Sequence, residues 1–222
     1  SAFLLNRSSD LAIVTTIAHG STGNKDLYAR WGSGVEYIDA DGSVQHHECD
    51  ELNGNETNLA EGWYVVRNTT PDGVDLTYEN QLTCDGDLNL ILCDGATMSL
   101  EDGLRANDTL TIYGQSEGTG TLTASSSENT TLKASGIIIN GGIINATYTG
   151  SSTSNGAISA GGSDFIINRG SVNADGKQGY AVNTAYFHFN GFTICGKGTI
   201  DGNGTSYWEE FWIRRQWNRQ CT

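Results

Sequence analysis

The densest group of potential metal ligands in the chain is the run from His46 to Glu51, HHECDE. Imidazole, thiolate and carboxylate groups are the usual ligands of zinc. On an extended strand, however, alternation sends His46, Glu48 and Asp50 to one side and the remaining three side chains to the other. Ligands divided between two sides of a strand cannot surround one ion. The pattern favours a polar loop after a hairpin, and we expect no metal site here.

Acidic residues are the other abundant chemical group, with 26 Asp and Glu against 12 Lys and Arg and a formal net charge of −14. This balance argues against nucleic acid and anionic membrane as partners, because both are bound by clustered basic residues. No apolar run is long enough for membrane insertion. Calcium is the alternative partner for the carboxylates. The aspartates, however, are scattered in Asp-Gly turn pairs, so we expect no cofactor.

The elements that would position any site form a repeat between about residues 88 and 204. In each copy a short run of alternating apolar and polar residues ends in a corner. One pair of apolar residues, separated by one position, precedes this run, and a second such pair follows the corner. The apolar residue that opens the preceding pair recurs at Leu104, Leu132, Ile158 and Val182, at intervals of 28, 26 and 24 residues. Such intervals are typical of stacked repeats. The four runs are Leu110–Gly114, Ile137–Gly141, Phe165–Gly170 and Phe187–Gly191.

Three short strands per copy fit one three-sided coil. Because side chains alternate along a strand, the apolar members of each run point inward, and a coil can bury them only against its neighbours. We therefore expect an all-β fold, a right-handed parallel β-helix of about four to five coils over 81–204. The corners need left-handed backbone angles, which we assign to Asn140, Asn168 and Asn190.

An open end of such a solenoid exposes apolar core and unpaired strand edges, so both ends need a cover. At the N-terminal end the sequence predicts a hairpin from Val35 to His46 and a strand over 62–66. We expect the segment 32–80 to form a β-cap, with the large side chains of Trp63 and Tyr64 over the core.

The segment 205–222 is the one helical pattern in the chain. Ser206 and Glu209 match a capping box, and aromatic residues recur there every three to four positions on one stripe. Basic residues near the end of the segment suit the negative end of a helix dipole. We expect a short C-terminal helical cap.

The heptapeptide Gly198–Gly204, GTIDGNG, is similar to one in polygalacturonases, and together with the repeat it resembles the pectin-lyase-like β-helix superfamily. In those enzymes the heptapeptide precedes the catalytic coils. Their paired aspartates would have to follow Gly204, where 18 residues remain and none is Asp. Glu209 and Glu210 are adjacent on the expected helix, so they diverge instead of flanking a glycosidic bond.

A lyase would instead use a basic residue to take a proton beside a carboxylate, with calcium or arginine stabilising the anion. The candidates Lys133, Arg169 and Lys177 are isolated along the chain. We assign them to solvated faces and expect no enzymatic activity. A fragment of a polysaccharide-active enzyme, of the polygalacturonase or lyase type, is the competing hypothesis.

The segment 20–31, GSTGNKDLYARW, resembles the close of the repeat module of bacterial surface proteins of the internalin B-repeat type. That resemblance treats 1–31 as the tail of a longer module, and it implies a bacterial protein that is secreted or attached to the cell surface. The segments DLNLILCDGAT and TLTIYGQ, which begin at Asp87 and Thr109, resemble solenoid modules of such proteins that are described as carbohydrate-binding.

Surface recognition is the function that remains. Flat sheets of a solenoid can present outward aromatic rings to sugars, and the candidate ligand-binding residues are Trp217, Tyr148, Tyr180 and Tyr186, with Tyr113 a further outward aromatic. We expect a non-enzymatic extracellular module, glycan-binding or adhesin-like, whose partner is a polysaccharide or a cell-surface glycan. A purely structural stalk or spacer is the alternative. The oligomeric state and any pairing of the five cysteines stay open.

Overall fold

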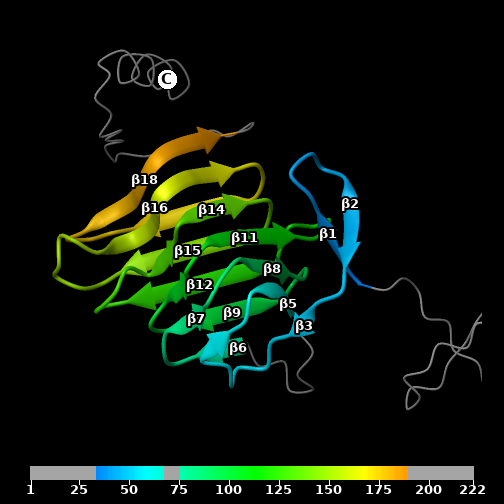
Figure 1. The fold of residues 1–222 in the computed structure, drawn as a ribbon, viewed down its shortest axis with the longest axis horizontal. Coiled ribbons are helices and arrows are strands. Elements are labelled where there is room, and N and C mark those ends of the chain that lie inside the picture. The colour runs from blue at the N-terminus through cyan, green and yellow to red at the C-terminus, as the bar shows by residue number, and fades with distance from the viewer. Residues whose placement is uncertain (1–33, 68–75, 190–222) are drawn as a thin grey trace, which may run out of the picture.

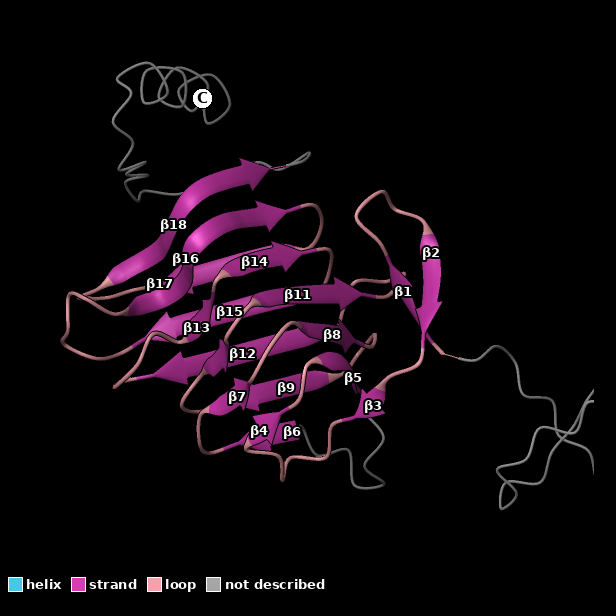
Figure 2. Cartoon of the chain, in the orientation of Figure 1, coloured by secondary structure: helices cyan, strands magenta, loops and turns pink. Residues whose placement is uncertain are grey.

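A computed structural model describes residues 34–67 and 76–189 of the chain. They form an all-β parallel solenoid of about five turns with a hairpin at one side, as Figure 1 and Figure 2 show. These residues contain no helix, and therefore none that could cross a membrane. The expected surface-repeat tail over 1–31 and helical cap over 205–222 lie outside the described residues.

Each turn has three sides, and the strands on each side pair in parallel with those of the next turn. The first side comprises β5 (Gly62–Val66), β8 (Leu88–Leu92), β11 (Thr109–Gly114) and β14 (Gly136–Ile139). The second comprises β6 (Leu76–Tyr78), β9 (Thr97–Leu100), β12 (Thr121–Ser126), β15 (Ile143–Tyr148) and β17 (Ser171–Asp175). The third comprises β4 (Asn58–Leu59), β7 (Leu82–Cys84), β10 (Leu104–Ala106) and β13 (Leu132–Ala134).

Two long strands join the third side to the first. β16 (Gly156–Ile167) and β18 (Tyr180–Phe189) run through the corner at which the earlier turns break into two strands. A short strand, β3 (Asp50–Glu51), pairs in parallel with β5. The first and third sides thereby become one sheet of 11 strands, while the second side is a separate sheet of 5.

The strand registers that the repeat predicts are confirmed. On the third side Leu104, Leu132, Ile158 and Val182 are aligned in successive turns. The aligned residues are Leu110, Ile137, Phe165 and Phe187 on the first side, and Leu122, Ile144 and Val172 on the second. Strands β4, β5 and β6, within the segment that the sequence assigns to a cap, pair with the next turn in the same way and so form a further coil.

The interior is filled by the inward side chains of all three sides. Leu104, Leu110 and Leu122, one from each side, have no measurable exposure and belong to one continuous cluster. Burying a side chain of this size stabilises the folded state by about 1.5 to 3 kcal/mol. Each inward residue lies between its aligned partners in the turns before and after, so the stability of one coil depends on its neighbours.

Two of the corner asparagines, Asn140 and Asn168, do not have the backbone role that the sequence predicts, and the third, Asn190, lies outside the described residues. The positive φ angles fall two residues after Asn140 and Asn168, at Gly142 (80°) and Gly170 (88°). Asn140 is only 3% exposed, and Asn168 Nδ2 donates a hydrogen bond of 2.8 Å to Asn140 Oδ1. The prediction was wrong because glycine, which has no Cβ, takes the left-handed angle while the asparagine side chains bond from turn to turn.

The predicted hairpin is confirmed. β1 (Val35–Ile38) pairs antiparallel with β2 (Val44–His47) around a turn in which Gly42 has a φ of 89°. It does not lie over an end of the coil stack. Val35 and Tyr37 instead pack against the outer face of β5, β8 and β11, so the hairpin covers a flank of the solenoid (Figure 1).

The first turn is closed by the loop between β3 and β4, which buries Leu52 in the core. Within it the Glu56 carboxylate accepts hydrogen bonds from Tyr78 Oη (2.7 Å) and from the backbone N–H groups of Asn53 and Gly54 (3.1 Å each). Burial alone would raise the pKa of Glu56, but these hydrogen bonds together lower it. Burial and the bond to Glu56 raise the pKa of Tyr78.

The register makes neighbouring isoleucines of β14 differ in their tolerance of charge. We expect Ile139→Asp to prevent folding, because a buried carboxylate without a partner costs several kcal/mol, comparable to the whole stability of a domain, about 5 to 15 kcal/mol. Ile167→Asp, in the next turn, should do the same. Ile138→Asp is the matched control, since Ile138 points outward and is partly exposed. A cooperative thermal transition of Ile139→Asp, measured by circular dichroism, would contradict the register.

The Glu56 contact predicts sensitivity to acid. Because its pKa is lowered on folding, the carboxylate stabilises the fold above the ordinary pKa of about 4.3, and this contribution is lost as the pH falls through the folded value. We expect Glu56→Gln to lower the free energy of unfolding by about 1 kcal/mol at pH 7 and to flatten its fall between about pH 5 and pH 3.

Urea unfolding at a series of pH values measures this effect. Glu101→Gln, at an exposed carboxylate, serves as the control and should keep the dependence of the original chain. An unchanged acid dependence in Glu56→Gln would show that the loop carboxylate does not contribute.

Candidate functional site

Two of the candidate tyrosines are structural. Tyr148 is 1% exposed, and its hydroxyl oxygen accepts a hydrogen bond from the Ser152 backbone N–H (3.2 Å). The interpretation of Tyr148 as an outward aromatic was therefore wrong. The alternation of β15 contains the signal, since Tyr148 continues the inward series of Ile144 and Ala146. Inward placement leaves the ring unavailable to a ligand.

Tyr180 is partly buried at the corner where β18 begins. Its hydroxyl lies 2.9 Å from that of Thr130, which is 5% exposed. Its ring occupies the space beside Gly156, where even a Cβ would meet it at 2.3 Å. Tyr180 thus closes the corner over a glycine in the preceding turn. Trp217, the fourth candidate, lies outside the described residues.

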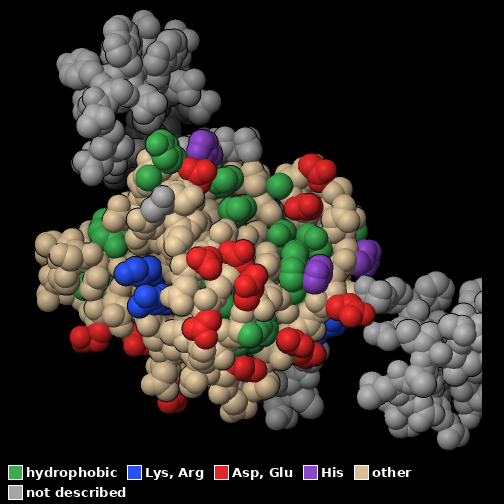
Figure 3. All heavy atoms as spheres, viewed as in Figure 1, with side chains coloured by type: hydrophobic (Ala, Val, Ile, Leu, Met, Phe, Trp, Pro, Cys, Tyr) green, Lys and Arg blue, Asp and Glu red, His purple; other side chains and the backbone are tan. Residues whose placement is uncertain are grey.

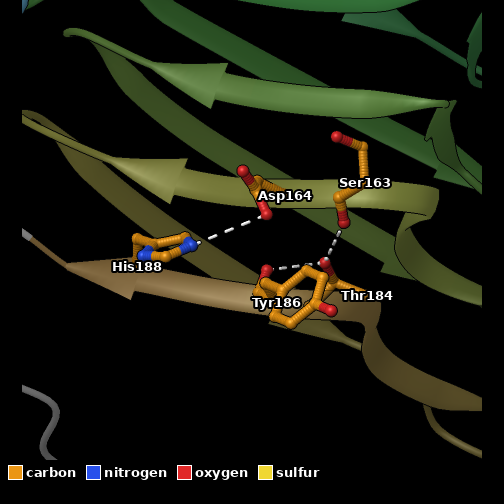
Figure 4. A network of polar contacts seen from close by, with 5 residues as sticks. All are labelled: Ser163, Asp164, Thr184, Tyr186 and His188. Carbon is orange, nitrogen blue, oxygen red and sulfur yellow. Dashed lines mark hydrogen bonds and ion pairs between the residues drawn. The ribbon is translucent and has the colours of Figure 1, made fainter.

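Tyr186 is the candidate that the structure places in the open, with 66% of its surface exposed. It stands on β18 directly beside Asp164 of β16, and His188 follows on the same outer face. His188 Nε2 lies 3.5 Å from Asp164 Oδ1, and the two side chains are 55% and 42% exposed. Figure 4 shows the carboxylate on β16 and the ring and the imidazole on the neighbouring β18.

A bulge in β16 positions this group. Between the aligned pairs Ala160–Thr184 and Asp164–Tyr186, three residues of β16 face one residue of β18. The Thr184 hydroxyl lies 3.0 Å from the Ser163 carbonyl oxygen and 2.8 Å from that of Tyr186, so its single proton can be donated to either oxygen or shared between them (Figure 4). The hydroxyl thereby satisfies a carbonyl displaced by the bulge and holds the two strands in place.

The arrangement suits binding better than acid–base chemistry. The carboxylate of Asp164 and the ring of His188 are both well exposed, and an exposed ion pair contributes little energy, about 0 to 1 kcal/mol. An aromatic face beside a hydrogen-bond acceptor and a donor is the usual equipment of a site for a polar ligand with an apolar face. We name Tyr186, Asp164 and His188 the tyrosine patch.

Comparison with protein-family models, with curated proteins and with solved structures gives no match. The structure alone shows the solenoid. Solenoid architecture does not by itself imply a ligand or a reaction. The resemblances to pectin-lyase-like enzymes and to B-repeat modules stay predictions. Any function has to be argued from the side chains of this chain.

The HHECDE run does not gather around one point. His46 Nε2 lies 3.9 Å from a carboxylate oxygen of Glu36, whereas the His47 ring stacks on Trp63 with centroids 4.1 Å apart. Burial raises the pKa of Cys49 to about 11, so the thiol is protonated at neutral pH and is a poor ligand. In the described ranges, no three His, Cys, Asp or Glu side chains are grouped to hold an ion.

The first side of the solenoid carries an apolar column on its outer face, which we name the flank column. Val65, Ile91 and Tyr113 are aligned in three successive turns and point outward, yet all are buried. Val35 and Tyr37 of the hairpin cover them. Tyr113, expected as an outward aromatic, is 8% exposed for this reason. The signal in the sequence was the recurrence of an apolar residue at an outward position.

Aromatic stacking holds the hairpin to this column. Trp63 lies between His47 of the hairpin and Tyr113 of the solenoid, with ring centroids 4.1 Å and 5.1 Å away. Tyr37 packs edge-on against Tyr113 at 4.7 Å. Trp63 therefore covers the flank rather than the open end that the sequence suggests for it. Each aromatic pair contributes about 0.5 to 1.5 kcal/mol beyond its buried area.

Lys133 is not isolated in space. It is aligned with Arg105 on the neighbouring strand, and both side chains are exposed. The prediction that Lys133 lies on a solvated face is confirmed. Its isolation along the chain, however, did not mean isolation in space. Arg105 and Lys133 each lie between the two apolar residues of a third-side strand, LRA and LKA. The repeat itself was therefore the signal that they are neighbours. The 28-residue interval separates neighbours in the sheet.

The flank stacking predicts that the hairpin can be released without unfolding the solenoid. We expect Trp63→Ala to remove three ring contacts, with Tyr37, His47 and Tyr113, and to speed proteolysis between Asp39 and Gly42, while the thermal transition of the solenoid persists about 2 to 5 °C lower. Trp63→Phe should keep most of the protection. Hydrogen exchange measures the two parts separately. If the hairpin and the solenoid lose protection together in Trp63→Ala, the hairpin is not released independently of the solenoid.

Proposed function

We propose that this chain is a non-enzymatic extracellular module of a bacterial surface protein, a right-handed β-helix of the pectin-lyase-like kind that binds glycan. The observation that carries the proposal is the exposure of Tyr186, 66%, beside Asp164 and His188 on two paired strands. The resemblance of segment 20–31 to B-repeat modules supports the bacterial surface location.

The tyrosine patch has the groups that recognise a sugar ring. The apolar face of the ring would stack on Tyr186, and its hydroxyl groups would donate to Asp164 and exchange hydrogen bonds with His188. Because Asp164 is negative and the formal net charge of the chain is −14, a neutral sugar fits this patch better than an acidic one. Strands β16 and β18 hold the groups on a preformed surface, so little ordering is needed on binding.

The tyrosine patch suits binding, because hydrolysis of a glycosidic bond requires two carboxylates that flank it. Asp164 faces an imidazole, and both groups are open to water. Affinity from one exposed ring is weak, and a surface protein that carries several modules compensates by multivalency. An adhesin-like role follows from the same arrangement.

We expect Tyr186→Ala to abolish binding in a screen of the purified chain against a glycan array, because the stacking surface is lost. Tyr186→Phe keeps the ring and should retain most of the signal. Val44→Ala removes another exposed apolar side chain, 53% exposed and in the hairpin, and is the matched control for nonspecific stickiness. Trp217→Ala tests the remaining candidate in parallel.

A polygalacturonate cleavage assay separates the alternatives. Binding without release of oligosaccharides, lost in Tyr186→Ala alone, would support the proposal. Release of oligosaccharides would overturn it in favour of the enzyme fragment. Absence of both binding and cleavage would favour a structural spacer.

A further inference from the structure

Arg105 and Lys133 form a pair of adjacent positive charges on the third side of the solenoid. They are in register on β10 and β13, so their Cα atoms are about 4.8 Å apart. Their neighbours in the same column, Thr83 before and Ser159 after, are uncharged. On the face shown in Figure 3, Lys and Arg side chains form a cluster to the left and a smaller group to the right, and several acidic side chains lie between them.

The pair borders a hollow of about 240 Å³. Asn107 and Ser135 line it where their strands end, and the Ser135 hydroxyl donates a hydrogen bond of 2.8 Å to the Asn107 carbonyl oxygen. Gly161 lines it from the next turn. A Cβ at this glycine would have no neighbour closer than Ser159 Oγ at 3.7 Å, so the space beside it is not filled by packed atoms.

Folding does not account for this pair of charges. Like charges directly opposite on neighbouring strands destabilise a sheet. Within the described ranges neither side chain forms an ion pair, although the chain has 26 acidic residues. Arg67, by contrast, lies 4.0 Å from a Glu51 carboxylate oxygen. The third side therefore holds two uncompensated cations beside an open hollow.

We propose that this hollow is a binding site for an oxyanion, a carboxylate or a sulfate ester carried by a ligand. The guanidinium of Arg105 can donate two parallel hydrogen bonds to one such group, and the ammonium of Lys133 supplies a second charge beside it. Asn107, an exposed lining residue, has a side-chain amide that could add a neutral donor. The site needs neither a sugar ring nor the tyrosine patch, and so stands apart from the proposed function.

The opposite charge of the two surfaces supports this separation. Asp164 disfavours an anion at the tyrosine patch, whereas the two cations favour one in the hollow. A ligand attracted to the hollow must approach a chain whose formal net charge is −14. Binding therefore depends on short-range contacts with the pair, and it weakens as salt screens them.

Titration of the purified chain with inorganic sulfate at low ionic strength, followed by NMR amide shifts, tests the site. We expect saturable shifts at residues around Asn107 and Ser135. Arg105→Gln and Lys133→Gln should each raise the dissociation constant about ten-fold. Arg67→Gln, which removes the same charge elsewhere, should leave it unchanged. Circular dichroism confirms that each variant is folded.

A filling variant tests the hollow independently of its charge. Gly161→Phe keeps both cations but places a ring in the open space, so it should also weaken sulfate binding. Tyr186→Ala should not, which separates failure of this site from failure of the tyrosine patch. Acetate, a sulfated oligosaccharide and a uronate oligosaccharide, titrated in the same way, identify the source of the oxyanion.

Saturable binding that is weakened in the two Gln variants and in Gly161→Phe would support the site. Tighter binding of the sulfated than of the uronate oligosaccharide would assign it to a sulfate ester, and the reverse order to a carboxylate. Absence of saturable sulfate and acetate binding, or equal binding by the original chain and the double variant Arg105→Gln/Lys133→Gln, would overturn the proposal.

Discussion

The structure depends on one constraint: each coil can bury its inward side chains only between the coils before and after it. Leu104, Leu132 and Ile158 illustrate it, since each is nearly inaccessible and is aligned with the next. Backbone hydrogen bonds follow the same direction, from turn to turn. Packing and hydrogen bonding therefore both require the same register, and a shift of one residue would turn the apolar side chains to solvent.

The same register organises the outer surface into columns of residues far apart in the sequence. The flank column is apolar, and Tyr37 of the hairpin packs over it. Trp63 of β5 stacks between the hairpin and the solenoid. Further along the solenoid, the bulge in β16 brings the outward residue Asp164 beside Tyr186. At the corners the asparagine side chains of Asn140 and Asn168 bond between turns. What a column can do depends on which side chains the stacking aligns.

The two proposed sites follow from this principle in different ways. The tyrosine patch is made by neighbouring turns and a local irregularity, and it offers an exposed ring with polar neighbours. The hollow is made by a regular column, in which two cations become neighbours because they occupy equivalent positions in consecutive repeats. Charge separates the functions expected of them, since one surface contains a carboxylate and the other contains two adjacent cations.

The sequence by itself determined the fold class and the three registers, because alternation and a fixed interval are local properties that stacking preserves. It also determined the hairpin, which it predicted from Val35 to His46 and which ends at His47. Only the tertiary structure decided which outward side chains are accessible. The sequence predicts Tyr148 and Tyr113 as outward aromatics, but both are buried, one by inward alternation and the other under the hairpin. Exposure depends on what covers a face, and the pairing of Arg105 with Lys133 depends on which turns are adjacent. Both are relations between distant segments, which a local pattern does not contain.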